Sequence, residues 1–144
     1  MVSKIFEFIP IMTKYTFLLC CLFLFLISIF GCQSQPYKQG EILYNNFCAN
    51  CHMEDGSGLK GNIPPLAGAD YVKENPLATA CITRKGMTGE LIVNGANYNQ
   101  PMPAITELSE FEITNVINYI NHAWGNDYGV VKLKDVRAEL SDCP

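Results

Sequence analysis

The chain has 144 residues, enough for one domain, and its 10 basic and 14 acidic side chains give a formal net charge of −4. Nucleic-acid-binding domains usually carry a basic surface, so this acidic balance argues against a nucleic-acid partner. Hydrophobic residues make up 49% of the sequence. That share is typical of globular proteins, but many of these residues stand in one block near the start of the chain.

This apolar block covers residues 17–30, FLLCCLFLFLISIF, and contains no charged residue. It is short for a membrane-spanning helix, which needs roughly 17–25 apolar residues. It fits the apolar core of a secretory signal peptide, with Lys14 as the positive flank. Met12 begins a complete signal sequence of its own and is an alternative start of the chain. We therefore predict that residues 1–31 are a signal peptide and that the protein is exported.

The block ends in the four residues IFGC, residues 29–32. An apolar residue, a small residue and then a cysteine resemble the lipobox of bacterial lipoproteins, in which cleavage precedes the cysteine and the cysteine carries the lipid. Phe30 is bulkier than the usual residue, so an uncleaved anchor helix and cleavage elsewhere remain alternatives. The sequence predicts lipidation at Cys32, a short tether over residues 32–37, and a location on the periplasmic side of a bacterial membrane.

The exported part begins with a predicted helix over residues 41–47, which leads directly into Cys48-Ala49-Asn50-Cys51-His52, here called the CANCH motif. Residues 53–70 follow with four glycines and two prolines, which disfavour regular elements and predict a loop. Two short helices are predicted over residues 70–74 and 77–85, and a brief strand over residues 90–93 before a turn at Asn94-Gly95.

The clearest predicted element is a helix from Glu110 to about Ala123. Ser109 and Glu112 have the S-x-x-E spacing of a capping box, which satisfies two backbone N–H groups at a helix start. Gly125 is expected to end the helix. Its apolar face falls at three- and four-residue steps, at Ile113, Val116, Ile117, Ile120 and Trp124. The whole pattern predicts an all-α fold of three or four helices with long loops, and such loops are usually functional.

The CANCH motif admits four interpretations. A structural zinc site needs further ligands, and the other cysteines and the other histidine are scattered along the exported part. A thioredoxin-like redox pair is expected beside a βαβ pattern, which this chain lacks. A disulfide with an unused histidine beside it remains open. The fourth interpretation uses every residue, because C-x-x-C-H is the attachment motif of c-type haem. Cys48 and Cys51 would form the thioethers, and His52 would ligate the iron.

A second iron ligand is sought among the methionines. Two of the five are lost with the signal peptide, and Met53 is too close to His52 in sequence to reach the opposite face of a haem. Met102 stands between two prolines just ahead of the capped helix, and proline fixes the local backbone. We therefore expect Met102 to be the distal ligand, with Met87 as the reserve candidate.

The CANCH motif, the proline-bracketed Met102 and the capped last helix together resemble the class I monohaem cytochromes c over about residues 38–124. Gly40 and Tyr44 match the pattern of the family's first helix, in which the glycine lets the last helix cross closely. The resemblance implies the cytochrome c fold, with helices and long loops around one covalently attached haem.

Residues 63–68, IPPLAG, resemble the loop that lies on the histidine side of the haem in this family. The resemblance implies that a proline carbonyl, by position that of Pro64 with Pro65 as the alternative, accepts a hydrogen bond from His52. Such a bond orients the ring and raises its basicity. The cytochrome domain is expected to cover residues 38–125.

Two stretches, residues 81–101 and the segment after Trp124, are absent from a minimal family member. Residues 126–144 are predicted to form a C-terminal extension that packs on the domain. Once the lipidated and haem-bound cysteines are set aside, Cys81 and Cys143 remain. They could pair in an oxidising compartment, and two free thiols are the alternative.

If His52 and Met102 fill both axial positions, the iron has no open site for a substrate. The resemblance therefore implies a one-electron carrier and no enzyme, with redox partners such as a quinol-oxidising complex, a terminal oxidase or a reductase and no small-molecule substrate. Three alternatives remain: a dedicated haem subunit of a periplasmic dehydrogenase or reductase, a gas sensor or enzyme with a labile methionine, and a lipoprotein without haem. Six residues are expected to wall the haem pocket: Ile63, Leu66, Leu91, Ile105, Val116 and Ile120.

Overall fold

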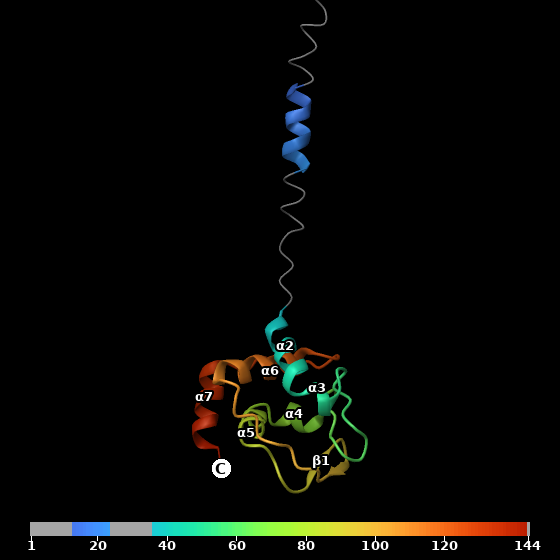
Figure 1. The fold of residues 1–144 in the computed structure, drawn as a ribbon, viewed down its shortest axis with the longest axis vertical. Coiled ribbons are helices and arrows are strands. Elements are labelled where there is room, and N and C mark those ends of the chain that lie inside the picture. The colour runs from blue at the N-terminus through green and yellow to red at the C-terminus, as the bar shows by residue number, and fades with distance from the viewer. Residues whose placement is uncertain (1–12, 24–35, 144) are drawn as a thin grey trace, which may run out of the picture. The chain divides into compact units, whose positions relative to one another are not determined.

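The computed structural model describes residues 13–23 and 36–143. The chain divides into two units, residues 1–36 and 37–144 (Figure 1). In the first unit residues 13–23 are helical, whereas the predicted cleavage site, the lipidation site at Cys32 and most of the tether lie outside the described residues. No helix within the described ranges is both long and apolar enough to cross a membrane.

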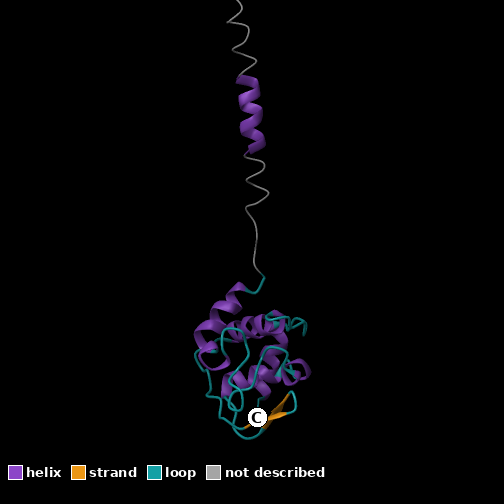
Figure 2. Cartoon of the chain, turned by 90° about the vertical axis from the view of Figure 1, so that its right-hand side faces the viewer, coloured by secondary structure: helices purple, strands orange, loops and turns teal. Residues whose placement is uncertain are grey.

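Helices dominate the second unit, as the sequence predicts (Figure 2). They are α2 (Lys38–Phe47), α3 (Ala49–His52), α4 (Asp70–Glu74), α5 (Ala78–Lys85), α6 (Glu110–His122) and α7 (Leu133–Asp142), and they are joined by long loops and one two-stranded hairpin, β1 (Leu91–Val93) and β2 (Ala96–Tyr98). The all-α class is confirmed, but the predicted number of helices is too small. The difference arises because α3 is a single turn within the CANCH motif and α7 lies in the C-terminal extension.

Helices α2 and α6 pack directly against each other at Gly40. A Cβ atom built on Gly40 would lie 2.7 Å from the Cβ of Tyr119 and closer still to the backbone carbonyl of Asn115. Only glycine therefore allows this crossing. Beside it, the fully buried ring of Tyr44 meets the rings of Tyr119 and Trp124 at centroid distances of 5.4 and 5.0 Å, and this aromatic cluster fixes the two helices relative to each other.

The start of α6 has the predicted capping box. The backbone N–H of Glu112 donates to the hydroxyl of Ser109 at 3.3 Å, and the backbone N–H of Ser109 donates to the Glu112 carboxylate at 2.8 Å. The apolar face of α6 is buried as expected, at Ile113, Val116, Ile117 and Ile120. This helix therefore supplies the central packing surface of the unit.

The predicted strand is half of a hairpin. Asn94 and Gly95 form its turn with φ values of 52° and 73°, and two positive φ values suit the twist of a tight hairpin. Because side chains alternate between the faces of a strand, Val93 is buried while its neighbour Ile92 is 65% exposed. Tyr98, paired with Leu91 across the hairpin, is also buried.

Asparagine side chains of α6 bind the first part of the C-terminal extension. Asn118 donates to the backbone carbonyl of Val131 at 3.0 Å and accepts the Val131 N–H at 2.9 Å, while Asn121 donates to the carbonyl of Gly129 at 3.0 Å. The segment before α7 is thereby held along α6. The sequence also contains a signal for α7, since its apolar residues Leu133, Val136 and Leu140 have helical spacing.

Candidate functional site

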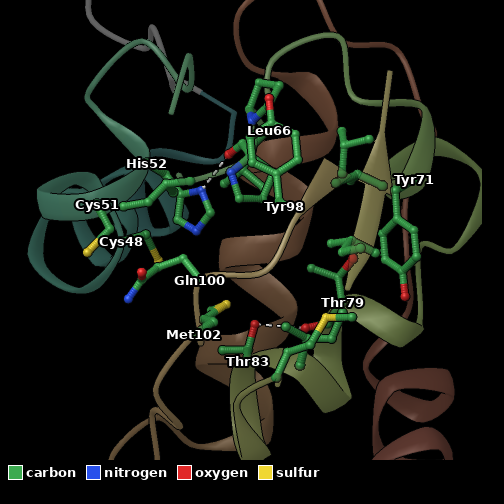
Figure 3. A pocket seen from close by; sticks show the side chains of 18 of the residues that line it. Cys48, Cys51, His52, Leu66, Tyr71, Thr79, Thr83, Tyr98, Gln100 and Met102 are labelled. Carbon is green, nitrogen blue, oxygen red and sulfur yellow. Dashed lines mark hydrogen bonds between the residues drawn. The ribbon is translucent and has the colours of Figure 1, made fainter. Parts of the chain in front are cut away.

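A cavity of about 320 Å³ lies between α3, α5, α6, the hairpin and the loop around residue 102 (Figure 3). None of the described residues that line it carries a charge, and apolar side chains predominate. Five of the expected wall residues line it: Ile63, Leu66, Leu91, Val116 and Ile120. Ile105, the sixth expected wall residue, is absent from the lining and belongs to the buried core.

The turn of α3 brings Cys48, Cys51 and His52 to one wall of the cavity. The backbone carbonyl of Cys48 accepts the N–H groups of Cys51 at 3.1 Å and of His52 at 2.9 Å. Residues three and four positions apart share one face of a helix, so both thiols and the imidazole line the same cavity. Burial, assisted by the nearby Cys51, raises the pKa of the Cys48 thiol to about 11.

His52 is oriented by the loop that follows it. Its side chain is 7% exposed, and ring atom Nδ1 donates to the carbonyl of Pro64 at 3.1 Å. This bond fixes the tautomer, because a neutral ring with its proton on Nδ1 leaves the Nε2 lone pair free for a metal. Burial lowers the pKa of His52, and the bond to Pro64 opposes that effect. Pro64, and not the alternative Pro65, makes this contact.

Met102 lines the same cavity from the loop ahead of α6, and Figure 3 shows it on a different wall from His52. Met87 also lines the cavity. The backbone of the loop is pressed against the end of α5, since a Cβ atom on Gly86 would lie 2.5 Å from the carbonyl oxygen of Met102. The structure thus brings both candidate methionines and His52 to one cavity.

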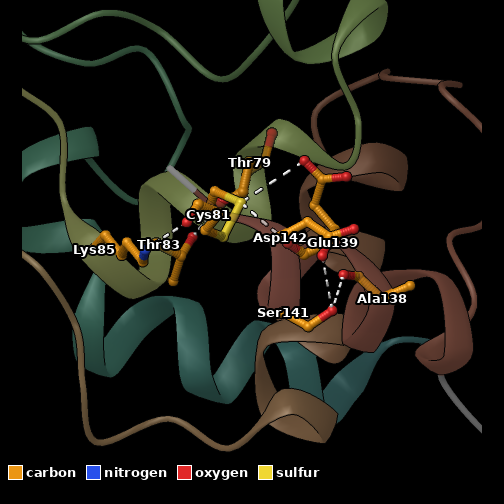
Figure 4. The surroundings of a disulfide bond; sticks show 9 residues. Thr79, Cys81, Thr83, Lys85, Ala138, Glu139, Ser141 and Asp142 are labelled. Carbon is orange, nitrogen blue, oxygen red and sulfur yellow. Dashed lines mark hydrogen bonds between the residues drawn. A yellow bond between two sulfur atoms is a disulfide. The ribbon is translucent and has the colours of Figure 1, made fainter.

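Two other cysteines of the second unit lie outside the cavity lining and are bonded to each other. Cys81 of α5 and Cys143, next to the end of α7, form a disulfide with an S–S distance of 2.03 Å (Figure 4). It closes the C-terminal extension against α5. His122 stacks on Tyr37 at a centroid distance of 4.4 Å and is absent from the cavity lining. Within the described ranges no three His, Cys, Asp or Glu side chains form a group that could hold a metal ion.

Sequence reasoning missed several polar and aromatic residues of the cavity. Thr79 and Thr83 are one helical turn apart on α5, and the Thr83 hydroxyl donates to the Thr79 carbonyl at 2.8 Å. The hairpin alternation could have identified Tyr98. The missed residues that Figure 3 labels are Tyr71, Thr79, Thr83, Tyr98 and Gln100.

The arrangement can hold a group with both covalent and coordinate bonds. Two thiols one turn apart can bond covalently to one ligand, a buried imidazole nitrogen can coordinate a metal in it, and a thioether is available from another wall. Nitrogen and soft sulfur ligands of this kind suit iron and copper. The uncharged walls can exclude water from such a group.

Comparison with known proteins identifies a matching family model and several relatives. The Cytochrome c family model matches residues 37–124. Cytochrome c-552 of Thermus thermophilus is 36% identical over 96 residues, which cover 64% of this chain and 73% of that protein.

Two further relatives are subunits of larger enzymes. The cytochrome c subunit of the quinone alcohol dehydrogenase of Gluconobacter oxydans is 35% identical over 68% of this chain, and the gluconate 2-dehydrogenase cytochrome c subunit of Pantoea cypripedii is 32% identical over 73%. The chain spans only 21% and 24% of the length of these two subunits. From the family match and the cytochrome c-552 relative it follows that the chain belongs to the cytochrome c family, as an electron-transfer protein with covalently bound c-type haem and not an enzyme.

Proposed function

We propose that this protein is a class I, His/Met-ligated monohaem cytochrome c that carries single electrons between exported respiratory proteins. One observation supports this most strongly: the thiols of Cys48 and Cys51, the ring of His52 and the thioether of Met102 all line one uncharged cavity. The residues fit the cofactor because His52 is buried, its Nδ1 proton is engaged by Pro64, and its Nε2 lone pair is free.

In this proposal Cys48 and Cys51 hold the porphyrin through thioethers, and His52 and Met102 are the axial iron ligands. The bound haem supplies reversible one-electron chemistry between ferrous and ferric iron. The methionine ligand raises the reduction potential. The uncharged cavity walls act in the same direction, because they disfavour the additional positive charge of the oxidised state.

The organisation that goes with this function is a signal peptide over residues 1–31, a lipid-bearing Cys32 with a tether to residue 37, a cytochrome domain over residues 38–125 and a packed extension over residues 126–144. Lipid anchoring would keep the carrier at the outer face of a membrane, close to a quinol-oxidising complex as donor and an oxidase or reductase as acceptor. The relatives within quinone alcohol dehydrogenase and gluconate 2-dehydrogenase support a second proposal, a dedicated haem subunit of a periplasmic dehydrogenase.

The first test is expression of the full chain in a host that attaches c-type haem in its periplasm. We expect haem that stays with the denatured chain in the wild type and is released when both Cys48 and Cys51 are replaced by serine. The native ferrous protein should not bind carbon monoxide, because both axial positions are filled. Rapid binding of carbon monoxide at neutral pH would instead indicate an open site and contradict the carrier proposal.

The two functional proposals differ in the stability of the partner complex. A mobile carrier should purify from gently solubilised native membranes without a stoichiometric partner, whereas a dedicated subunit should purify together with its dehydrogenase.

The variant Cys32→Ser tests the lipid anchor. We expect the wild type in the membrane fraction and the variant in the soluble periplasmic fraction. Equal membrane retention of both would favour an uncleaved anchor helix.

A further inference from the structure

Asn126 lies just beyond the segment that matches the family, and both polar atoms of its side chain form hydrogen bonds. Its amide nitrogen donates to the carbonyls of Ile120 at 2.7 Å and Leu66 at 3.0 Å, and its amide oxygen accepts the N–H of Gly68 at 2.8 Å. The residue is 7% exposed. It therefore joins the end of α6 to the far end of the loop over residues 53–68, here called the proximal loop.

Trp124, two residues earlier, holds the near end of the same loop. Its ring nitrogen donates to the carbonyl of Glu54 at 3.0 Å, and its ring lies so close to Gly56 that a Cβ atom there would come within 2.5 Å of it. The loop is also closed on itself, since Leu66 N–H donates to the carbonyl of Gly56 at 2.8 Å. Residues after the last turn of α6 thus clamp both ends of the proximal loop.

Pro64 lies inside this clamp and accepts the hydrogen bond of His52 at 3.1 Å. Only Pro65 separates it from Leu66, and a proline ring fixes φ, so few soft torsions lie between the Pro64 carbonyl and the carbonyl that Asn126 holds. Gly58 lies against the other side, where a Cβ atom would come within 2.5 Å of the Pro64 oxygen. The position of that oxygen is therefore determined by the clamp on one side and Gly58 on the other.

We propose that Asn126 is a positioning residue for the redox centre, which acts through Leu66 and Pro64 to keep the carbonyl of Pro64 in hydrogen-bonding position for His52. The inference rests on the proposed function, in which His52 is an iron ligand. A well-placed carbonyl raises the basicity of the ring and so favours ferric iron. Loss of Asn126 should weaken this bond and make the reduction potential more positive.

The chain contains a matched control in Asn118. It is 8% exposed, close to the 7% of Asn126, and it also pairs with backbone groups of a distant segment, those of Val131. Those contacts are made to the C-terminal extension and not to the proximal loop. Replacing either asparagine by alanine removes buried hydrogen bonds and should destabilise the fold, but only one replacement releases the loop that carries Pro64.

The test compares Asn126→Ala and Asn118→Ala with the wild type as haem-loaded full chains. The readouts are the reduction potential and the exchange rate with solvent of the His52 Nδ1 proton, followed by NMR in the ferrous state. We expect a positive shift of the potential and faster exchange in Asn126→Ala, and neither change in Asn118→Ala. Asn126→Ser, which retains one polar side-chain atom, should be intermediate, and it decides the question if the alanine variant does not fold.

Unchanged potential and exchange in a folded Asn126 variant would overturn the inference, as would equal changes in Asn118→Ala, because either outcome leaves only a general structural role. Failure of the proposed function looks different. In that case the wild type itself would lack a His52 ring signal shifted by bound haem, whatever the variants do.

Discussion

Met87 and Met102 lie directly opposite each other in an isolated antiparallel bridge, in which each backbone N–H donates to the carbonyl of the other at 2.9 Å. Directly opposite residues of an antiparallel pair project their side chains to the same face, and both thioethers line the cavity. Proximity alone therefore does not select the iron ligand. The two prolines beside Met102 restrict its backbone, and this rigidity favours it over Met87.

Met102→Leu is expected to abolish the sulfur-to-iron absorption band of the oxidised protein and to lower the reduction potential, because a thioether ligand favours ferrous iron. Met87→Leu is the matched control and should retain both properties. Visible spectra and potentiometric titrations of the two variants measure this. Loss of the band in Met87→Leu with retention in Met102→Leu would reverse the assignment.

Gly40→Ala should destabilise the protein by about 1–3 kcal/mol, the usual cost of forcing extra atoms into a packed contact. The added methyl group would collide with the Asn115 carbonyl and with Tyr119, so α2 would have to move away from α6. Urea unfolding of the haem-loaded protein measures the loss. Asn45→Ala, on the exposed side of α2, should leave the stability nearly unchanged, and equal effects of the two substitutions would contradict this account of the crossing.

Replacing both Cys81 and Cys143 by serine should also lower the stability. Their disulfide links residues 62 positions apart, and for a loop of that length the chain-entropy relation gives about 4 kcal/mol. Unfolding by urea, followed by fluorescence, measures the difference. The double variant avoids a lone thiol. If its unfolding midpoint equals that of the wild type, the disulfide does not constrain the unfolded chain in the expected way.

The capping box of α6 should make part of the stability depend on pH. Two hydrogen bonds from Ser109 hold the pKa of Glu112 below its ordinary value of 4.5. The bond from the Ser109 hydroxyl has the larger effect, and the bond from the Ser109 backbone N–H has the smaller one. A lowered pKa in the folded state means that ionised Glu112 stabilises the fold above 4.5 and that this contribution is lost as the pH falls through the folded-state pKa.

Ser109→Ala removes the larger cause of the shift. The stability difference between the wild type and this variant should therefore be greatest at neutral pH and smaller in acid. In acid the difference should be that due to the hydrogen bond from the Glu112 backbone N–H to the Ser109 hydroxyl. Thr114→Val is the control, because the Thr114 hydroxyl donates to the neutral carbonyl of Glu110 at 2.7 Å. The loss of stability in Thr114→Val should not change with pH. A pH-independent loss of stability in Ser109→Ala would contradict the proposed coupling between Glu112 ionisation and folding.

The features predictable from the sequence were those with a local signal. The S-x-x-E spacing of Ser109 and Glu112 predicted the start of α6, and the Asn94-Gly95 pair predicted the turn of the hairpin. The resemblance to a family contributed Pro64 as the partner of His52, a contact between residues 12 positions apart that composition and periodicity do not specify.

Contacts made at long range could not be predicted in this way. Asn126 bonds to Leu66, 60 residues earlier, and a single asparagine after a helix carries no local sign of such a partner. The same holds for Tyr71 of α4 and for Gln100, whose place at the cavity depends on how segments distant in the sequence meet. The helix α7 is different, because the helical spacing of its apolar residues is a local signal in the sequence.

The disulfide between Cys81 and Cys143 has a consequence for the biogenesis of the protein. The proposed thioether cysteines must remain reduced until haem is attached, whereas Cys81 and Cys143 must become oxidised in the same chain. Cys143 follows Cys81 by 62 residues, so Cys81 is synthesised before its partner and can mispair with the CANCH thiols. Correct maturation therefore depends on the order of events: Cys81 must not be oxidised while the CANCH thiols are its only available partners, and attachment of haem to Cys48 and Cys51 removes those partners.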